Sequence, residues 1–257
     1  MLSVPVRAAN DIEPCPCCGG RAPLFGVVDF NKSCEDRPVP ILALSGTPVY
    51  YNRCEACDYV FSRAFDHWNK AAFAQHIYDQ DYAVVDPEFA EVRPMRLVND
   101  VTQLFGAYRE QISILDWGGG DGKAAAKLTE QGFDATCYDP FFNETSELPK
   151  RQFDLIMAIE VIEHLVDPLV LPQAALTLLK PDGVVVMSTC IQPPEFVRER
   201  MNWWYLAPRN GHIGVHSEKS LYLIWQRHGF QLGSSVDKNI HMAYRNLPEF
   251  ARPLIGL

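Results

Sequence analysis

Short apolar runs alternate with amphipathic segments along the carboxyl-terminal part of the chain. The run Phe153–Ile159 (FDLIMAI) is apolar enough for a strand buried on both faces, and Ile112, Ile114 and Leu115 mark a second strand. Between residues 95 and 105, apolar side chains recur at helical spacing and predict a packing helix. Strands that alternate with helices predict an α/β domain with a mainly parallel sheet.

The amino-terminal part is rich in cysteine instead. Six of the eight cysteines lie within residues 15–57, and four of them form two C-x-x-C pairs, Cys15 with Cys18 and Cys54 with Cys57. Two such knuckles can place four thiolates tetrahedrally around zinc, and a closed site of this kind stabilises a small domain without doing chemistry. A redox or disulfide role and unligated thiols are the alternatives. Cys17 and Cys34 are extra, and either could replace a knuckle cysteine.

These patterns predict three parts. Residues 1–65 form a zinc-ribbon-like module, residues 66–94 form a connector with short helices, and residues 95–257 form the α/β domain. In the connector, Tyr78 and Tyr82 either pack locally or line the mouth of a substrate site. A chain of 257 residues is long enough for one full-sized α/β domain with a small appendage.

Composition excludes some function classes. Hydrophobic residues make up 47% and charged residues 21%, as in an ordinary soluble protein. The net charge of −9 argues against a nucleic-acid partner, because phosphate binding needs a surplus of Lys and Arg. Because the first residues lack the pattern of a signal peptide and no run of about 18 apolar residues occurs, we expect a cytoplasmic protein with no membrane contact. The oligomeric state stays open.

The clearest functional signal is a glycine-rich turn after the first predicted strand of the α/β domain. In ISILDWGGGDGK, Asp116 ends the strand, and glycines stand at positions 118, 119, 120 and 122 before a helix. Glycine allows positive φ and close backbone approach, and a helix N-terminus offers unpaired N–H groups. The dinucleotide pattern fails because Lys123 occupies its last glycine position, and the phosphate-loop pattern fails because Ala124 follows Lys123.

The remaining pattern, Asp116-x-Gly118-x-Gly120-x-Gly122, resembles the first motif of class I S-adenosylmethionine-dependent methyltransferases. The resemblance covers about residues 95–245 and includes FDATCYDP, FDLIMAIEVIEHL and ALTLLKPDGVVVMST. It implies a Rossmann-like, seven-stranded sheet. It also implies that Asp116 and the glycines, Gly119 included, hold the methionine end of S-adenosylmethionine, while Asp139 accepts hydrogen bonds from the ribose.

The sequence departs from this family at the third strand. Only 14 residues separate Asp139 from Asp154, too few for the usual helix and strand. We therefore expect the third strand to be shortened or missing. Glu147 and Leu148 are the candidates for the adenine contact.

The segment EVIEHL follows the fourth predicted strand. If it is helical, Glu160, Glu163 and His164 share one face. In many relatives this segment is a pocket wall in which the glutamate contacts the cofactor. In the small-RNA 2′-O-methyltransferases and the ubiquinone-pathway O-methyltransferases, which it resembles closely, it binds a divalent metal, and here His212 or His216 could complete the site. A helix cap is the third interpretation.

Catalysis and acceptor binding are assigned to the same region. His164, His212 and His216 are candidate bases, with Glu163 beside them, because histidine titrates nearest to neutral pH. Aromatic and basic residues after the fifth strand could form a stacking wall and pair with an acidic group, or could pack the loop against the sheet. These residues are Trp203, Trp204, Tyr205, Arg209 and Arg200.

The sequence thus predicts a methyltransferase that acts on a small hydroxylated or saccharide-like acceptor, at oxygen. A cysteine module before such a domain is also similar to bacterial sugar and secondary-metabolite methyltransferases. The cofactors would be S-adenosylmethionine, a structural zinc and a second divalent metal. The alternatives are C-methylation of a nucleotide sugar, and a non-catalytic scaffold that recruits a partner through the zinc module.

Overall fold

The computed structural model describes residues 4–7, 10–36, 39–142 and 147–254. Its contacts divide the chain into two compact units, each built from separate stretches of sequence. The first unit contains residues 1–87, 163–169 and 190–224, and the second contains residues 88–162, 170–189 and 225–257. The predicted ranges 1–65, 66–94 and 95–257 are continuous, whereas the first unit also includes the segment after the fifth predicted strand.

The first unit is organised around an antiparallel sheet with the strand order β1-β2-β3-β4-β9. Each C-x-x-C knuckle lies where the chain turns between strands, the first between β1 and β2 and the second between β3 and β4. The strand β9 comes from the segment after residue 190 and pairs with β4. The bounds are Ile12–Pro14 (β1), Arg21–Asp29 (β2), Pro48–Arg53 (β3), Val60–Phe61 (β4) and Gly214–Val215 (β9).

Short helices and an aromatic core complete this unit. Trp68 packs edge-on against Phe65 and Phe73, and Phe30 lies against the same group. The side chain of Asn69 caps the first helix by accepting a hydrogen bond from the Ala72 N–H group. The helices are Lys70–His76 (α1), Tyr82–Val85 (α2) and Phe196–Glu199 (α6), with 3₁₀ turns at Ile162–His164, Arg200–Asn202 and Pro208–Asn210.

The second unit contains a six-stranded sheet with the order β10-β11-β8-β7-β5-β6. Strands β6, β5, β7 and β8 run parallel, and the hairpin β10–β11 joins antiparallel to β8. This arrangement confirms the predicted Rossmann-like methyltransferase sheet. The bounds are Ser113–Trp117 (β5), Asp134–Tyr138 (β6), Phe153–Ile159 (β7), Leu179–Ser188 (β8), Gln231–Ser234 (β10) and Ile240–Tyr244 (β11).

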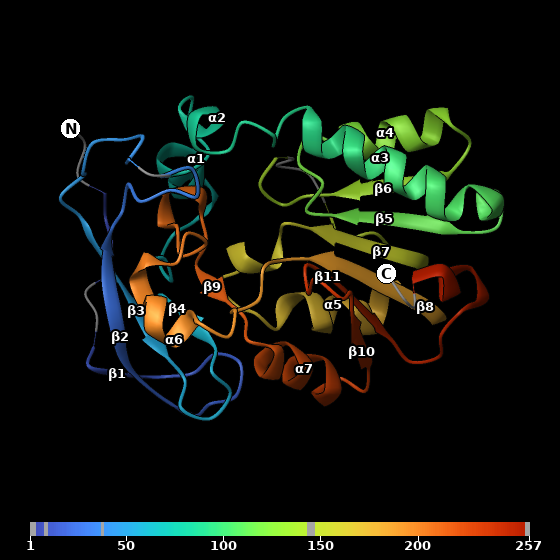
Figure 1. Cartoon of the computed structure of the whole chain (residues 1–257). Coiled ribbons are helices and arrows are strands. Elements are labelled where there is room, and N and C mark those ends of the chain that lie inside the picture. Colours follow the sequence, from blue (N-terminus) through green and yellow to red (C-terminus); the bar gives the residue numbers. More distant parts are fainter. Residues whose placement is uncertain (1–3, 8–9, 37–38, 143–146, 255–257) are drawn as a thin grey trace. The chain divides into compact units, whose positions relative to one another are not determined.

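Two helices lie side by side next to β5 and β6 in Figure 1. Val98, Val101 and Phe105 of α3 and Leu128 of α4 join the buried residues of β5, β7 and β8 in one apolar core. The helix α7 begins in the first unit and ends in the second. The bounds are Val92–Phe105 (α3), Lys123–Glu130 (α4), Val170–Leu178 (α5) and Glu218–Arg227 (α7), with further 3₁₀ turns at Gly106–Tyr108 and Glu249–Leu254.

Of three local features, the first agrees with the sequence pattern and the other two differ from it. The described part of residues 140–152 contains no strand, so the sheet has six strands in the described chain and the third strand is missing rather than shortened there. The Lys-Pro-x-Gly turn at residues 180–183 is a bulge inside β8. A 3₁₀ turn begins at Ile162, after Glu160 with φ of 53°, so EVIEHL is not a continuous helix.

No helix among the described residues is both long enough and apolar enough to cross a lipid bilayer.

Candidate functional site

The glycine-rich turn connects β5 to α4 in the second unit. Gly118, Gly120 and Gly122 have φ of 83°, 60° and 81°, values that L-residues with a side chain rarely adopt. Gly122 precedes the first residue of α4. The turn therefore brings backbone close to the carboxyl end of β5, where open α/β sheets bind ligands.

Asp116 lies buried under this turn, with 3% of its surface exposed. A Cβ atom on Gly119 would lie within 2.3 Å of the Asp116 carboxylate, so only glycine fits at that position. Among the described residues, no hydrogen-bond donor reaches Oδ2 of Asp116. Burial, reinforced by the charge of Asp139, raises the pKa of the Asp116 carboxyl to about 7. A buried carboxylate with an unsatisfied oxygen is a group prepared for a polar or cationic ligand.

Asp139 follows β6 and is tied to the same turn. Its Oδ2 accepts a hydrogen bond from the Gly120 N–H group at 2.9 Å, and its Oδ1 accepts from the N–H groups of Phe141 and Phe142 at 2.7 and 3.2 Å. These bonds hold the carboxylate at the end of β6, next in the sheet to β5. The two predicted cofactor carboxylates therefore lie on neighbouring strand ends.

Glu160 stands at the end of β7 in left-handed backbone geometry. The Ser188 hydroxyl, at the end of β8, donates to Oε1 of Glu160 and accepts from its N–H group, both at 2.8 Å. Glu160 belongs to the second unit, whereas Glu163 and His164 belong to the first. Strained backbone of this kind persists only where surrounding contacts hold it in place, and it is common at functional sites.

The four predicted zinc ligands come together in the first unit. The sulfur atoms of Cys15, Cys18, Cys54 and Cys57 all lie within 4.8 Å of one another. Cys15 and Cys57 are 3.6 Å apart and Cys18 and Cys54 are 3.4 Å apart. Four sulfurs at Zn–S distances of 2.3 Å in a tetrahedron would be separated by about 3.8 Å. The cluster is thus close to the size that a zinc ion needs.

The two extra cysteines lie in different places. Cys17 is buried beside the cluster, and burial raises the pKa of its thiol. Cys34 lies outside the cluster, with its sulfur 3.7 Å from Nδ1 of His212.

A second group of ligand-type side chains consists of Glu163, His164 and His212, whose donor atoms also lie within 4.8 Å of one another. We call it the EHH cluster. Glu163 is fully buried, and its Oε1 lies 3.9 Å from Nε2 of His164. The rings of His164 and His212 meet edge to face at 5.1 Å. One carboxylate and two imidazoles are a donor set that suits a divalent transition metal.

Three other predicted residues, His216, Trp203 and Trp204, are not among the residues of this cluster. His216 is buried, with Nδ1 3.2 Å from the Ser220 hydroxyl and its ring 4.6 Å from that of Tyr59, and it is not among the residues of the EHH cluster. Trp203 is buried against Phe196, and Trp204 is 37% exposed.

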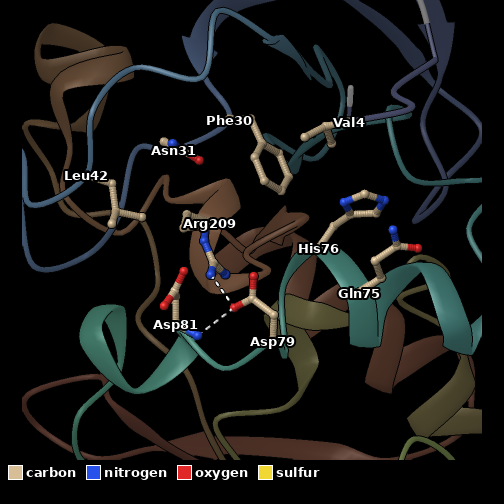
Figure 2. Close-up of a pocket in the computed structure, with 9 residues that line it drawn as sticks. All are labelled: Val4, Phe30, Asn31, Leu42, Gln75, His76, Asp79, Asp81 and Arg209. Atoms are coloured by element: carbon tan, nitrogen blue, oxygen red, sulfur yellow. Dashed lines mark hydrogen bonds and ion pairs between the residues drawn. The ribbon is translucent and has the colours of Figure 1, made fainter. Parts of the chain in front are cut away.

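Arg209, predicted to pair with an acidic substrate group, is paired within the chain. Its guanidinium donates to Oδ1 of Asp79 and to the carbonyl of Ile77, both at 2.6 Å. Figure 2 shows this pair among the residues that line a pocket of about 290 Å³ in the first unit. The pocket is lined by Val4, Phe30, Asn31, Leu42, Gln75, His76, Asp79, Asp81 and Arg209.

Comparison with known proteins identifies the family of residues 88–235, a range that includes parts of both units. The sequence matches the profile of a methyltransferase domain family over residues 88–235, more than half of the chain. The chain belongs to this methyltransferase domain family.

Similar proteins agree with this assignment but share only part of their length. A ubiquinone biosynthesis O-methyltransferase of Actinobacillus pleuropneumoniae serotype 5b is 39% identical over 54 residues, 21% of this chain and 23% of that protein. One from Bradyrhizobium diazoefficiens is 44% identical over 41 residues, 16% of each chain. The chain thus spans less than a quarter of the curated relatives it matches.

A solved structure, an O-methyltransferase family protein from Burkholderia thailandensis, has the same fold. It is 14% identical, with a TM-score of 0.52, over 70% of this chain and 64% of that chain.

The methyltransferase domain fits S-adenosylmethionine at the glycine-rich turn. The unsatisfied Oδ2 of Asp116 and the close backbone approach at Gly119 form a cradle that a Cβ atom would fill. Sequence reasoning missed Ser188, which holds Glu160. A signal for it was available, because Ser188 is a polar residue at the end of the apolar strand next to β7.

Gly211 lies against the His164 ring of the EHH cluster. Its φ is 88°, and a Cβ atom there would lie 2.8 Å from Nδ1 of His164. We expect Gly211→Ala to lower the free energy of unfolding by about 2–3 kcal/mol, because it adds a collision to the backbone strain. Gly46→Ala is the matched control, since Gly46 also has positive φ (74°) but open space around it. Denaturant unfolding measures the free energy of unfolding of both variants. An equal loss of stability in the two would contradict the proposed collision.

Proposed function

We propose that the chain is an S-adenosylmethionine-dependent methyltransferase that methylates an oxygen atom of a small hydroxylated or saccharide-like acceptor. The observation that carries this proposal is the buried Asp116 carboxylate under a turn of positive-φ glycines, in a domain of the methyltransferase family. In this role Asp116 and the glycines at 118, 119, 120 and 122 hold the methionine end of the cofactor. Asp139 accepts hydrogen bonds from its ribose, and Glu160 contacts its amino-acid end.

The chemistry supplied by S-adenosylmethionine, when bound, is an already activated methyl group. The chain has to position the acceptor and remove a proton from its hydroxyl. We assign that proton transfer to His164 and His212, with Glu163 beside them, because imidazoles accept protons near neutral pH. His216 is left out because its contacts are with Ser220 and Tyr59. The names of the relatives, O-methyltransferases in ubiquinone biosynthesis, support oxygen as the acceptor atom.

The acceptor is testable by labelling. The purified chain is incubated with tritiated-methyl S-adenosylmethionine and a metabolite extract, and the labelled product is isolated. We expect a small polar product with the label in a methyl ether. A label attached to carbon would contradict O-methylation and favour a C-methyltransferase.

We further propose that Cys15, Cys18, Cys54 and Cys57 bind one structural zinc. The short sulfur–sulfur distances and the position of each knuckle between two strands support this assignment. Such thiolates persist in a reducing compartment, so we propose a cytoplasmic location together with the zinc.

The EHH cluster is proposed to bind a second divalent metal through Glu163, His164 and His212. A metal there would occupy the lone pairs of the two imidazoles and take over their task, because a bound divalent ion favours the ionised form of an acceptor hydroxyl. Glu163→Gln keeps the shape of the side chain but removes its charge, so we expect the affinity for Mn²⁺, used as a paramagnetic probe, to fall by about tenfold or more. Mn²⁺ titration of the zinc-loaded chain measures this loss. The control is Glu195→Gln, an exposed residue; equal Mn²⁺ affinity in both variants would contradict the site.

A further inference from the structure

Tyr205 touches two members of the EHH cluster with two different groups. Its phenol O–H donates to Oε1 of Glu163 at 2.6 Å. Its backbone carbonyl lies 2.8 Å from Nδ1 of His212, and its ring lies 4.2 Å from the imidazole. The side chain is 1% exposed. A residue so buried cannot stack its ring on a substrate. Its contribution to the cluster therefore comes from its hydroxyl and its backbone carbonyl.

We propose that Tyr205 is the positioning residue of the EHH cluster. This inference rests on the proposed function of that cluster. It replaces the role in a substrate-stacking wall that the sequence pattern indicated for Tyr205.

The carbonyl of Tyr205 sets the tautomer of His212. A carbonyl oxygen can only accept, so the hydrogen bond at 2.8 Å requires a proton on Nδ1 of His212. In the neutral ring, the lone pair is then on Nε2, the atom that can bind a metal or accept a proton. Histidine ligands are commonly oriented in this way, by a carbonyl or carboxylate on the opposite nitrogen.

The phenol of Tyr205 orients Glu163. Hydrogen bonds to an ionised carboxylate are short and strong, and one at 2.6 Å holds the carboxylate against rotation. Because Glu163 is fully buried, this bond also replaces hydration that the carboxylate lacks.

Tyr205 is itself held from both sides. Nζ of Lys32 donates to the carbonyls of Trp203 and Leu206, at 2.8 and 2.5 Å. The Tyr51 hydroxyl donates to the carbonyl of His212 at 2.7 Å. The amino-terminal segments that carry Lys32 and Tyr51 therefore fix the loop that carries Tyr205 and His212. Supporting hydrogen bonds of this kind hold ligand side chains in one orientation.

The test is Tyr205→Phe in the full zinc-loaded chain, which removes one oxygen and keeps the ring and the backbone carbonyl. We expect the Mn²⁺ dissociation constant to rise by about 10- to 100-fold, while S-adenosylhomocysteine binds within about twofold of wild type. Tyr50→Phe, a β3 position that is not among the residues of the EHH cluster, is the matched control and should bind Mn²⁺ as wild type does. Unchanged Mn²⁺ affinity in Tyr205→Phe would overturn the inference.

Histidine-¹⁵N NMR of the wild-type chain supplies a readout that does not depend on metal or on the folding of a variant. We expect the His212 ring to show the Nδ1–H tautomer, and an Nε2–H tautomer would overturn the inference. If wild-type protein binds no Mn²⁺, the metal assignment of the proposed function fails by itself. In that case the His212 tautomer tests whether the carbonyl of Tyr205 orients the imidazole.

Discussion

The Asp116→Asn variant is expected to bind S-adenosylhomocysteine at least about tenfold more weakly than wild type and yet to be more stable. Asn has the shape of Asp but cannot pair with a cationic ligand group, so binding weakens. The same change removes a buried, poorly solvated charge, and we expect the free energy of unfolding above pH 7 to rise by up to about 4 kcal/mol. A residue that lowers stability but supports binding is typical of a functional site.

The gain in stability should depend on pH. Burial raises the pKa of Asp116 to about 7, from an ordinary value of 3.8, so the folded chain binds more protons than the unfolded chain between about pH 4 and 7. The free energy of unfolding of wild type therefore falls as the pH rises through this window and levels off above it. Asp116→Asn should lack this fall, and the difference between the two proteins should be small at pH 4 and largest above pH 7.

Denaturant unfolding from pH 4 to 8 and calorimetric titration at pH 7.5 measure both effects. The control is Asp100→Asn, an exposed position on α3, which should change neither quantity. An Asp116→Asn protein that binds as tightly as wild type would remove Asp116 from the cofactor site. One that is less stable than wild type at pH 8 would show that the carboxylate is satisfied in the folded chain.

Cys54→Ser is the second variant with a large expected effect. Cys54 is fully buried, and its loss leaves three thiolates at a site that needs four ligands. Structural zinc in small modules contributes about 10–16 kcal/mol of binding free energy to folding. We therefore expect the zinc content to fall from about one per chain towards zero, with loss of solubility and of hydrogen-exchange protection in β3 and β4.

Cys190→Ser is the matched control for this variant, since Cys190 is not part of the four-cysteine cluster. Zinc analysis by mass spectrometry and amide hydrogen exchange compare the three proteins. Full zinc content in Cys54→Ser would mean that another thiol, such as the adjacent Cys17, serves as the ligand. Wild-type protein that holds no zinc would reject the structural-zinc assignment.

Most features of the second unit could be predicted because they are local. The strand that contains Asp116, the four glycines and the helix that follows are adjacent in sequence, so their types and order define the turn. Phe153–Ile159 is apolar except for Asp154 and forms β7 with the predicted bounds. The absence of a third strand from the described part of residues 140–152 followed from chain length alone, since 14 residues lie between Asp139 and Asp154.

The features that the sequence did not predict depend on contacts between distant segments. The two cysteine pairs could be matched through their spacing, but the support of His212 by Tyr51 joins residues 161 positions apart and has no periodicity to reveal it. Arg209 is a plausible partner for an acidic substrate in the sequence, and only the fold shows that Asp79 already pairs with it. Likewise, the composition of the segment Trp203–Tyr205 cannot separate a stacking wall from buried support. Burial decides that question for Tyr205.

The most direct test of the account is isothermal titration calorimetry of the full wild-type chain with S-adenosylmethionine and S-adenosylhomocysteine. The central claim is that the glycine-rich turn and Asp116 bind this cofactor. We expect both compounds to bind at one site per chain, with dissociation constants of about 1 μM to 1 mM, the range usual for enzyme substrates. Absence of binding by both compounds would contradict the account.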